Sequence, residues 1–142
     1  MVYLDTSAVV PLVVAETASD FCRELWDSAD AVVTCRLTYV EAAAALAQAE
    51  RLGRVEPPQR RAALSLLDRL WPEFDIVEVD DSLVRAAADV ALRQALRGYD
   101  AVHCAAAVQL DAPDLVAASG DRKLLAAWRS LRLATADTNA EH

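Results

Sequence analysis

The chain has 142 residues and a net charge of −8, and 55 % of its residues are hydrophobic. This length fits one domain with a core of its own, and the hydrophobic fraction excludes a disordered chain. The acidic balance argues against a nucleic-acid partner, because binding a polyanion usually requires a basic surface.

Short apolar runs rich in β-branched residues alternate with stretches in which apolar residues recur at helical spacing. The short runs predict strands at residues 2–4, 31–35, 75–79, 115–118 and 131–135. The helical stretches begin near residues 8, 18, 37, 57, 83, 100 and 121. Gly53 and Gly98 are expected to end the helices before them, and Pro11 to lie in a first turn.

Strands separated by helices imply right-handed crossovers between parallel strands. We therefore expect a single α/β domain over residues 1–135, a doubly wound sandwich of about five parallel strands flanked by helices. Residues 136–142 are expected to form a disordered tail. In such sheets, ligands bind outside the carboxyl ends of the strands, so that edge is where functional residues are sought.

Cysteine usage indicates a reducing compartment. The three cysteines, Cys22, Cys35 and Cys104, are odd in number and far apart, which suits neither a disulfide framework nor a zinc site. We also find no signal-peptide pattern after Met1 and no run of about 18 apolar residues that could span a membrane. A cytoplasmic location is therefore expected.

Three aspartates lie where this fold class binds ligands. Asp5 directly follows the first strand, Asp121 follows the fourth strand behind Ser119 and Gly120, and Asp100 opens a helix. Each has an ordinary alternative role, since Asp is a favoured helix N-cap and suits the positive end of the helix dipole.

Glu41 is harder to explain by local structure alone. It lies in an Ala-rich helical stretch, and a lone buried carboxylate is costly unless it is paired, protonated or bound to a metal. The alternatives are exposure to solvent or pairing with an arginine such as Arg36. His103, one turn after Asp100, is expected to be a packed or supporting residue.

Four converging carboxylates would repel one another unless cations neutralise them. Oxygen ligands suit Mg²⁺ or Mn²⁺, and such an ion can activate a water and polarise a phosphodiester. The sequence therefore favours metal-dependent chemistry on a phosphodiester, with no side chain needed as nucleophile.

The acids lie within four segments, YLDTSA (3–8), RLTYVE (36–41), LRGYDAVH (96–103) and ASGDRKL (118–124). In this order the segments resemble the PIN-domain family, and closely its VapC-type toxin branch. The resemblance implies a Mg²⁺-dependent endoribonuclease, with Mn²⁺ as a substitute. The implied metal-binding and catalytic residues are Asp5, Glu41, Asp100 and Asp121, supported by Thr6 and Ser119.

The resemblance also implies a homodimer and a cognate VapB-type antitoxin whose tail blocks the acidic site. One departure is Gly120, where a bulkier residue is common in the family. RNA remains compatible with the acidic total charge if arginines form a local rim, and Arg51 and Arg54 are the predicted RNA-binding residues. The alternative is that the arginines are solvated and form helical ion pairs such as Asp89–Arg93.

Two other readings stay open. A catalytically silent PIN module could act only as an RNA- or protein-binding scaffold. A receiver-like signalling domain is also α/β with clustered acids, but it needs a phosphoacceptor Asp after the third strand. Here Asp75 begins that strand and Asp80 and Asp81 follow it without the supporting pattern.

Overall fold

A computed structural model describes residues 1–142. Its sheet has five parallel strands in the order β3-β2-β1-β4-β5. The strands are β1 (Val2–Leu4), β2 (Val32–Cys35), β3 (Asp75–Val77), β4 (Val116–Ser119) and β5 (Ala134–Asp137). The helices are α1 (Thr6–Val13), α2 (Ser19–Ser28), α3 (Leu37–Arg51), α4 (Pro57–Leu70), α5 (Asp81–Gln94), α6 (Gly98–Gln109) and α7 (Arg122–Ser130), with a 3₁₀ turn, η1, at Trp71–Glu73.

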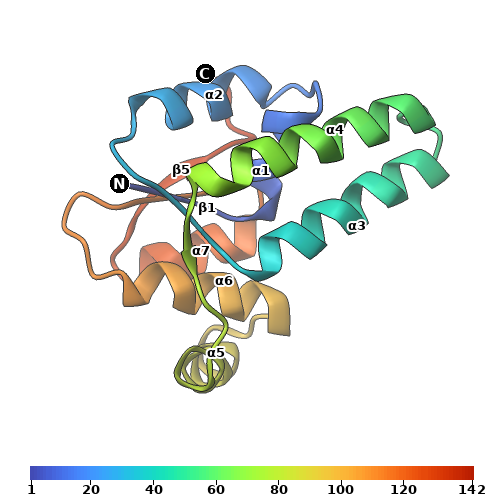
Figure 1. Cartoon of the computed structure of the whole chain (residues 1–142). Helices are drawn as coiled ribbons and strands as arrows, with labels where there is room; N and C mark the ends of the chain where they lie inside the picture. Colours follow the sequence, from blue (N-terminus) through green and yellow to red (C-terminus); the bar gives the residue numbers. More distant parts are fainter.

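Helices cover both faces of the sheet (Figure 1). Side chains alternate along each strand, so in β1 Val2 and Leu4 face one layer and Tyr3 faces the other. The first layer contains α1, α2, α3 and α4, and the second contains α5, α6 and α7. The doubly wound α/β fold predicted from the sequence is confirmed.

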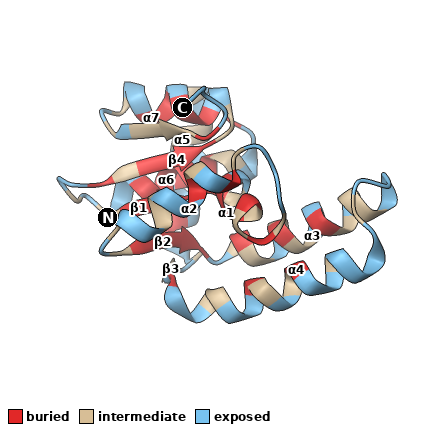
Figure 2. Cartoon of the chain, turned by 90° about the horizontal axis from the view of Figure 1, so that it is seen from above, coloured by how far each residue is buried: buried red, intermediate tan, exposed pale blue.

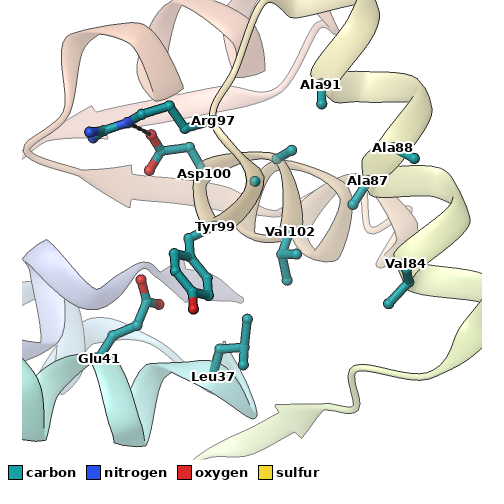
Figure 3. A pocket seen from close by; sticks show the side chains of 12 residues that line it. Leu37, Glu41, Val84, Ala87, Ala88, Ala91, Arg97, Tyr99, Asp100 and Val102 are labelled. Atoms are coloured by element: carbon teal, nitrogen blue, oxygen red, sulfur yellow. Dashed lines mark ion pairs between the residues drawn. The ribbon is translucent and has the colours of Figure 1, made fainter.

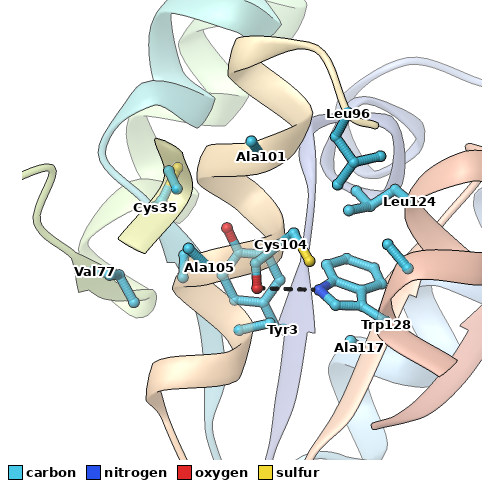
Figure 4. Packing of buried hydrophobic residues seen from close by; sticks show 14 of the residues in the cluster. Tyr3, Cys35, Val77, Leu96, Ala101, Cys104, Ala105, Ala117, Leu124 and Trp128 are labelled. Carbon is cyan, nitrogen blue, oxygen red and sulfur yellow. Dashed lines mark hydrogen bonds between the residues drawn. The ribbon is translucent and has the colours of Figure 1, made fainter. Parts of the chain in front are cut away.

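The second layer packs around Trp128, which is fully buried against Tyr3 with ring centroids 6.0 Å apart (Figure 4). Its indole Nε1 donates to the carbonyl of Cys104 over 3.4 Å, so the buried polar atom is satisfied. Small residues on α6, such as Ala105, let the helix approach the sheet closely. This packing fixes α6, which carries Asp100.

Helices α3 and α4 form a long hairpin that reaches beyond the sheet (Figure 2). Buried residues on its inner side join it to the first layer, while its far end is exposed. The start of α3 therefore lies at the sheet edge, and its last residue, Arg51, lies well away from it.

None of the helices combines the length and the apolar character needed to cross a membrane. The three cysteines are free and buried in the two cores.

Several boundaries differ from the sequence prediction. Gly98 does not end a helix: α5 stops at Gln94, Ala95 takes the left-handed conformation (φ 54°), and Gly98 is the first residue of α6. The earlier stop lets Leu96 turn into the core, where it is 8 % exposed. Helix α1 begins at Thr6 rather than residue 8, because Asp5 caps it.

Pro11 is therefore inside α1, not in its first turn. A proline there removes one backbone hydrogen bond, and the helix ends two residues later. The last strand runs from Ala134 to Asp137, later than the predicted 131–135, because α7 and a left-handed turn at Arg132 occupy the preceding residues. Residues 136 and 137, assigned to the tail from the sequence, thus belong to the sheet.

Candidate active site

The strand order reverses between β1 and β4, and their carboxyl ends form the crevice where open α/β sheets bind ligands. A cavity of about 450 Å³ lies at this edge, and five carboxylates line it. Four are the predicted ones, those of Asp5, Glu41, Asp100 and Asp121, and the fifth is that of Glu16. The order also differs from the receiver-type order 2-1-3-4-5, which counts against a receiver-like domain.

Asp5 lies at the end of β1 and is only 5 % exposed. Its Oδ1 accepts from the Ser7 hydroxyl (2.6 Å) and the Ala8 amide (3.1 Å), which makes it the N-cap of α1. Its Oδ2 accepts from the Ser119 hydroxyl over 2.5 Å. Burial raises the pKa of Asp5, although His103 and these hydrogen bonds oppose the rise.

Glu41 extends from the second turn of α3 toward α1 and α6. Its Oε1 accepts from the Thr6 hydroxyl (2.8 Å) and from Nε2 of His103 (2.6 Å). The partner of Glu41 is therefore His103, not Arg36, which pairs with Glu78 at the surface.

His103 is 2 % exposed and bridges two groups. Its Nδ1 lies 2.7 Å from the Tyr3 hydroxyl and its Nε2 faces Glu41. Burial disfavours the charged ring, but hydrogen bonds to Cys35 and Glu41 outweigh it and raise the pKa of His103 to about 10. As an imidazolium it donates from both nitrogens. Burial would raise the pKa of Glu41, but His103 and Thr6 lower it overall.

Asp100 and Asp121 complete the four predicted carboxylates. Asp100 is the third residue of α6 rather than its cap, and its Oδ2 lies 3.6 Å from Nε of Arg97. Burial and the Asp121 carboxylate raise the pKa of Asp100, against the lowering effect of Arg97. Asp121 caps α7 by accepting from the amides of Lys123 and Leu124. Its capping role and its place in the cavity coexist.

The predicted supports both reach the site. Thr6 holds Glu41, and Ser119 bonds to Asp5 while accepting from the Asp121 amide over 2.9 Å. Ser7 was missed from the sequence: it bonds to Asp5 and accepts from the Gly120 amide over 2.8 Å. A hydroxyl two residues after an aspartate was the available signal.

Three further lining residues carried no sequence signal, and they are Glu16, Thr138 and Asn139. Asn139 donates to the carbonyl of Gly120 over 2.9 Å. A Cβ at Gly120 would lie 2.9 Å from the Asn139 amide nitrogen and 3.0 Å from Thr138 Oγ1. The glycine thus permits the last residues of the chain to border the cavity.

Arg51 and Arg54 do not line the acidic cavity. Arg51 donates to Gln48 within α3, and Arg54 borders a separate cavity between α1, α3 and α4. Arg51 follows Glu41 by ten residues, about 15 Å along the helix. The ion pair Asp89–Arg93 forms, with Nε 3.1 Å from the carboxylate.

The side chains that line the cavity suit a divalent cation. All four candidate ligands are carboxylates, the donors that Mg²⁺ and Mn²⁺ prefer. No group of three or more His, Cys, Asp or Glu side chains is arranged to hold a metal ion by itself. Mg²⁺ usually keeps several waters and takes only one or two carboxylates, so the open arrangement fits it.

This fold and this acidic crevice define the class of protein: the chain belongs to the PIN-domain family, whose model matches residues 2–130. Ribonuclease VapC49 from Mycobacterium tuberculosis is 39 % identical over 124 residues, covering 87 % of this chain and 86 % of its own. The structure of PAE2754 from Pyrobaculum aerophilum is 27 % identical, with a TM-score of 0.68 over 94 % of this chain and 81 % of that one.

A toxin–antitoxin complex from Klebsiella pneumoniae also shares the fold. Its matching chain is 16 % identical with a TM-score of 0.63, covering 99 % of this chain and 100 % of that one.

Proposed function

We propose that the chain is a Mg²⁺-dependent endoribonuclease, the toxin of a type II toxin–antitoxin pair, and that Mn²⁺ can replace Mg²⁺. The observation that carries this proposal is the acidic cavity between the carboxyl ends of β1 and β4, where the strand order reverses. The predicted carboxylates that line it come from four separate segments of the chain. The relative named Ribonuclease VapC49 supports RNA as the substrate.

In this proposal the four predicted carboxylates have different roles. Asp5 and Asp100 have raised pKa values, so each gains from a cation that restores favourable charge balance. They are the principal metal ligands, with Asp121 beside Asp100. The chemistry that the bound cation supplies is activation of a water molecule and polarisation of the phosphodiester.

Glu41 acts as an orienting ligand. Both of its hydrogen bonds end on Oε1, which leaves Oε2 without a partner in the protein, and Glu41 lines the cavity. Its lowered pKa makes it a weak proton acceptor, so its role is to bind rather than to remove a proton. His103 is a positioning residue that holds this carboxylate in place, and Thr6 fixes the same oxygen.

The proposal is tested by incubating the purified chain with RNA and titrating divalent ions. We expect cleavage with Mg²⁺ or Mn²⁺, none with a chelator, and products with a 5′-phosphate and a 3′-hydroxyl. Asp100→Asn should abolish cleavage while circular dichroism shows a folded protein. Full activity in this variant would refute the site, and RNA binding without cleavage by the wild type would indicate a silent scaffold.

A cognate VapB-type antitoxin is the proposed partner, supported by the fold shared with the toxin–antitoxin complex from Klebsiella pneumoniae. We also propose a homodimer that acts in the cytoplasm. Light scattering of the purified chain measures the oligomeric state, and a monomer at micromolar concentration would reject the dimer.

Arg51 and Arg54 remain the proposed contacts to the RNA backbone. They lie at the exposed far end of the α3–α4 hairpin, where they could hold a strand that extends out of the cavity. Replacing both with Glu should weaken RNA binding and leave metal binding intact. Unchanged RNA affinity would reject the assignment.

A further inference from the structure

A second cavity, of about 630 Å³, opens beside the acidic one (Figure 3). It lies between the start of α3, the exposed side of α5 and the start of α6, and Glu41 and Asp100 line both cavities. Its walls are mostly aliphatic: Leu37, Val84, Ala87, Ala88, Ala91 and Val102. An apolar chamber thus continues directly from the carboxylates that face the proposed reaction.

The aromatic ring of Tyr99 stands at the entrance to this second cavity. Tyr99 is 64 % exposed, although it precedes Asp100 directly in the chain. In Figure 3 its ring projects from α6 toward Leu37, with Glu41 alongside. The ring is therefore available to a ligand that also reaches the acidic cavity.

Arg97 supplies a positive charge at the same entrance. Its side chain is 89 % exposed, and its ion pair with Asp100 is long, at 3.6 Å. A weakly held guanidinium can turn to a phosphate, which it contacts with its planar set of donors. An aromatic ring, an apolar wall and an exposed guanidinium are groups that bind single-stranded nucleic acid.

We propose that this second cavity is a nucleobase subsite. A base next to the cleaved phosphodiester stacks on Tyr99 against the aliphatic wall, and Arg97 contacts the adjoining phosphate. This inference rests on the proposed ribonuclease function and adds to it a residue, Tyr99, that positions the RNA in the site.

An apolar wall of this kind is also found where two copies of a chain meet, but the charged residues beside it argue against that here. A copy seated there would cover the exposed guanidinium of Arg97 and one side of Glu41 and Asp100, and removing charges from water is costly. A nucleotide instead leaves both carboxylates open to the cation and to water.

The test uses an RNA oligonucleotide that the wild type cleaves at one mapped position, with Mg²⁺ present. Stacking of one base changes binding by about 5- to 150-fold, so Tyr99→Ala should raise KM by that factor and change kcat less. Tyr99→Phe should keep the wild-type KM, because the ring is retained. Leu92→Ala, a matched exposed position on α5 outside the cavity, should have no effect.

A second arm removes the base instead of the ring. Abasic nucleotides are placed in turn at each position beside the cleavage site. At one of them the KM of the wild type should rise to that of Tyr99→Ala, and the two changes together should add nothing further.

The outcomes separate this inference from the proposed function. If the wild type cleaves RNA but Tyr99→Ala leaves KM unchanged, or the two changes add independently, the subsite is wrong and the ribonuclease stands. A change in molar mass on Tyr99→Ala would show a contact between copies and also overturn the subsite. If the wild type cleaves no RNA under any divalent ion, the proposed function itself fails.

Discussion

Asp5 is held by neutral donors, two serine hydroxyls and a backbone amide, whereas Glu41, in the same cavity, meets the charged imidazole of His103. Their pKa values move in opposite directions as a result: that of Asp5 is raised and that of Glu41 is lowered. Burial penalises both carboxylates, so the difference comes from the partner.

The contrast indicates which end of the cavity needs an external cation. Glu41 already has an internal one, 2.6 Å away. Asp5 has none within hydrogen-bond distance, and the nearby carboxylates of Asp100 and Asp121 add negative charge. A divalent ion is therefore expected at the Asp5 end, with Glu41 as a preorganised neighbour.

The largest expected effect on this difference between Asp5 and Glu41 is that of His103→Leu, which removes the positive charge beside Glu41. Glu41 would be left as a half-buried carboxylate facing an apolar side chain, and we expect a loss of about 3 kcal/mol in the free energy of unfolding. Chemical denaturation measures it. His103→Gln, which can still donate to Glu41, is the matched control and should lose less; equal losses would mean that shape, not charge, matters.

Metal binding tests the Asp5 end of the cavity. At a free Mg²⁺ concentration 100 times its Kd, the wild type should gain about 2.7 kcal/mol. Asp5→Asn should lose that gain and raise the stability of the metal-free protein, because ionised Asp5 destabilises the fold as pH rises through its raised pKa. Thermal unfolding with and without Mg²⁺ gives both numbers. A full Mg²⁺ gain in Asp5→Asn would place the ion elsewhere.

The pH dependence of stability separates the two ends further. The folded-state pKa of His103 is raised from 6.5 to about 10, so its contribution is complete below 6.5 and is lost as pH rises through about 10. The lowered pKa of Glu41 contributes stability above 4.5 that is lost as pH falls through its folded value. Unfolding midpoints of the wild type and His103→Gln should converge at high pH, and parallel curves would contradict the ion pair.

The smallest expected effect is that of Ser119→Ala. It removes one neutral hydrogen bond to Asp5 and the acceptor of the Asp121 amide, for a loss of about 1 kcal/mol. Denaturation of the metal-free protein measures the loss, and Ser130→Ala is the control at an exposed hydroxyl. A loss as large as that of His103→Leu would show that a neutral partner of Asp5 contributes as much stability as the charged partner of Glu41.

The sequence predicted the sheet and the meeting of the acids because both follow from local pattern. Apolar runs give the strands, and parallel strands bring their carboxyl ends together, which carries Asp5 and Asp121 to one edge. Capping, offered as the alternative for these two, turned out to be compatible with lining the cavity.

The pairing of Glu41 could not be predicted in this way. Its partner lies 62 residues further along the chain, and only the packing of α6 against the sheet brings His103 to it. The helix end at Ala95 was missed for a related reason: burial of Leu96 outweighs the usual preference for glycine at a left-handed residue.

Because Gly120 has no side chain, Thr138 and Asn139 can pack directly against the loop that precedes Asp121. Any larger residue at this position would collide with Thr138 and Asn139. A relative that carries one there must send its terminus along another path, so the two regions should change together in evolution.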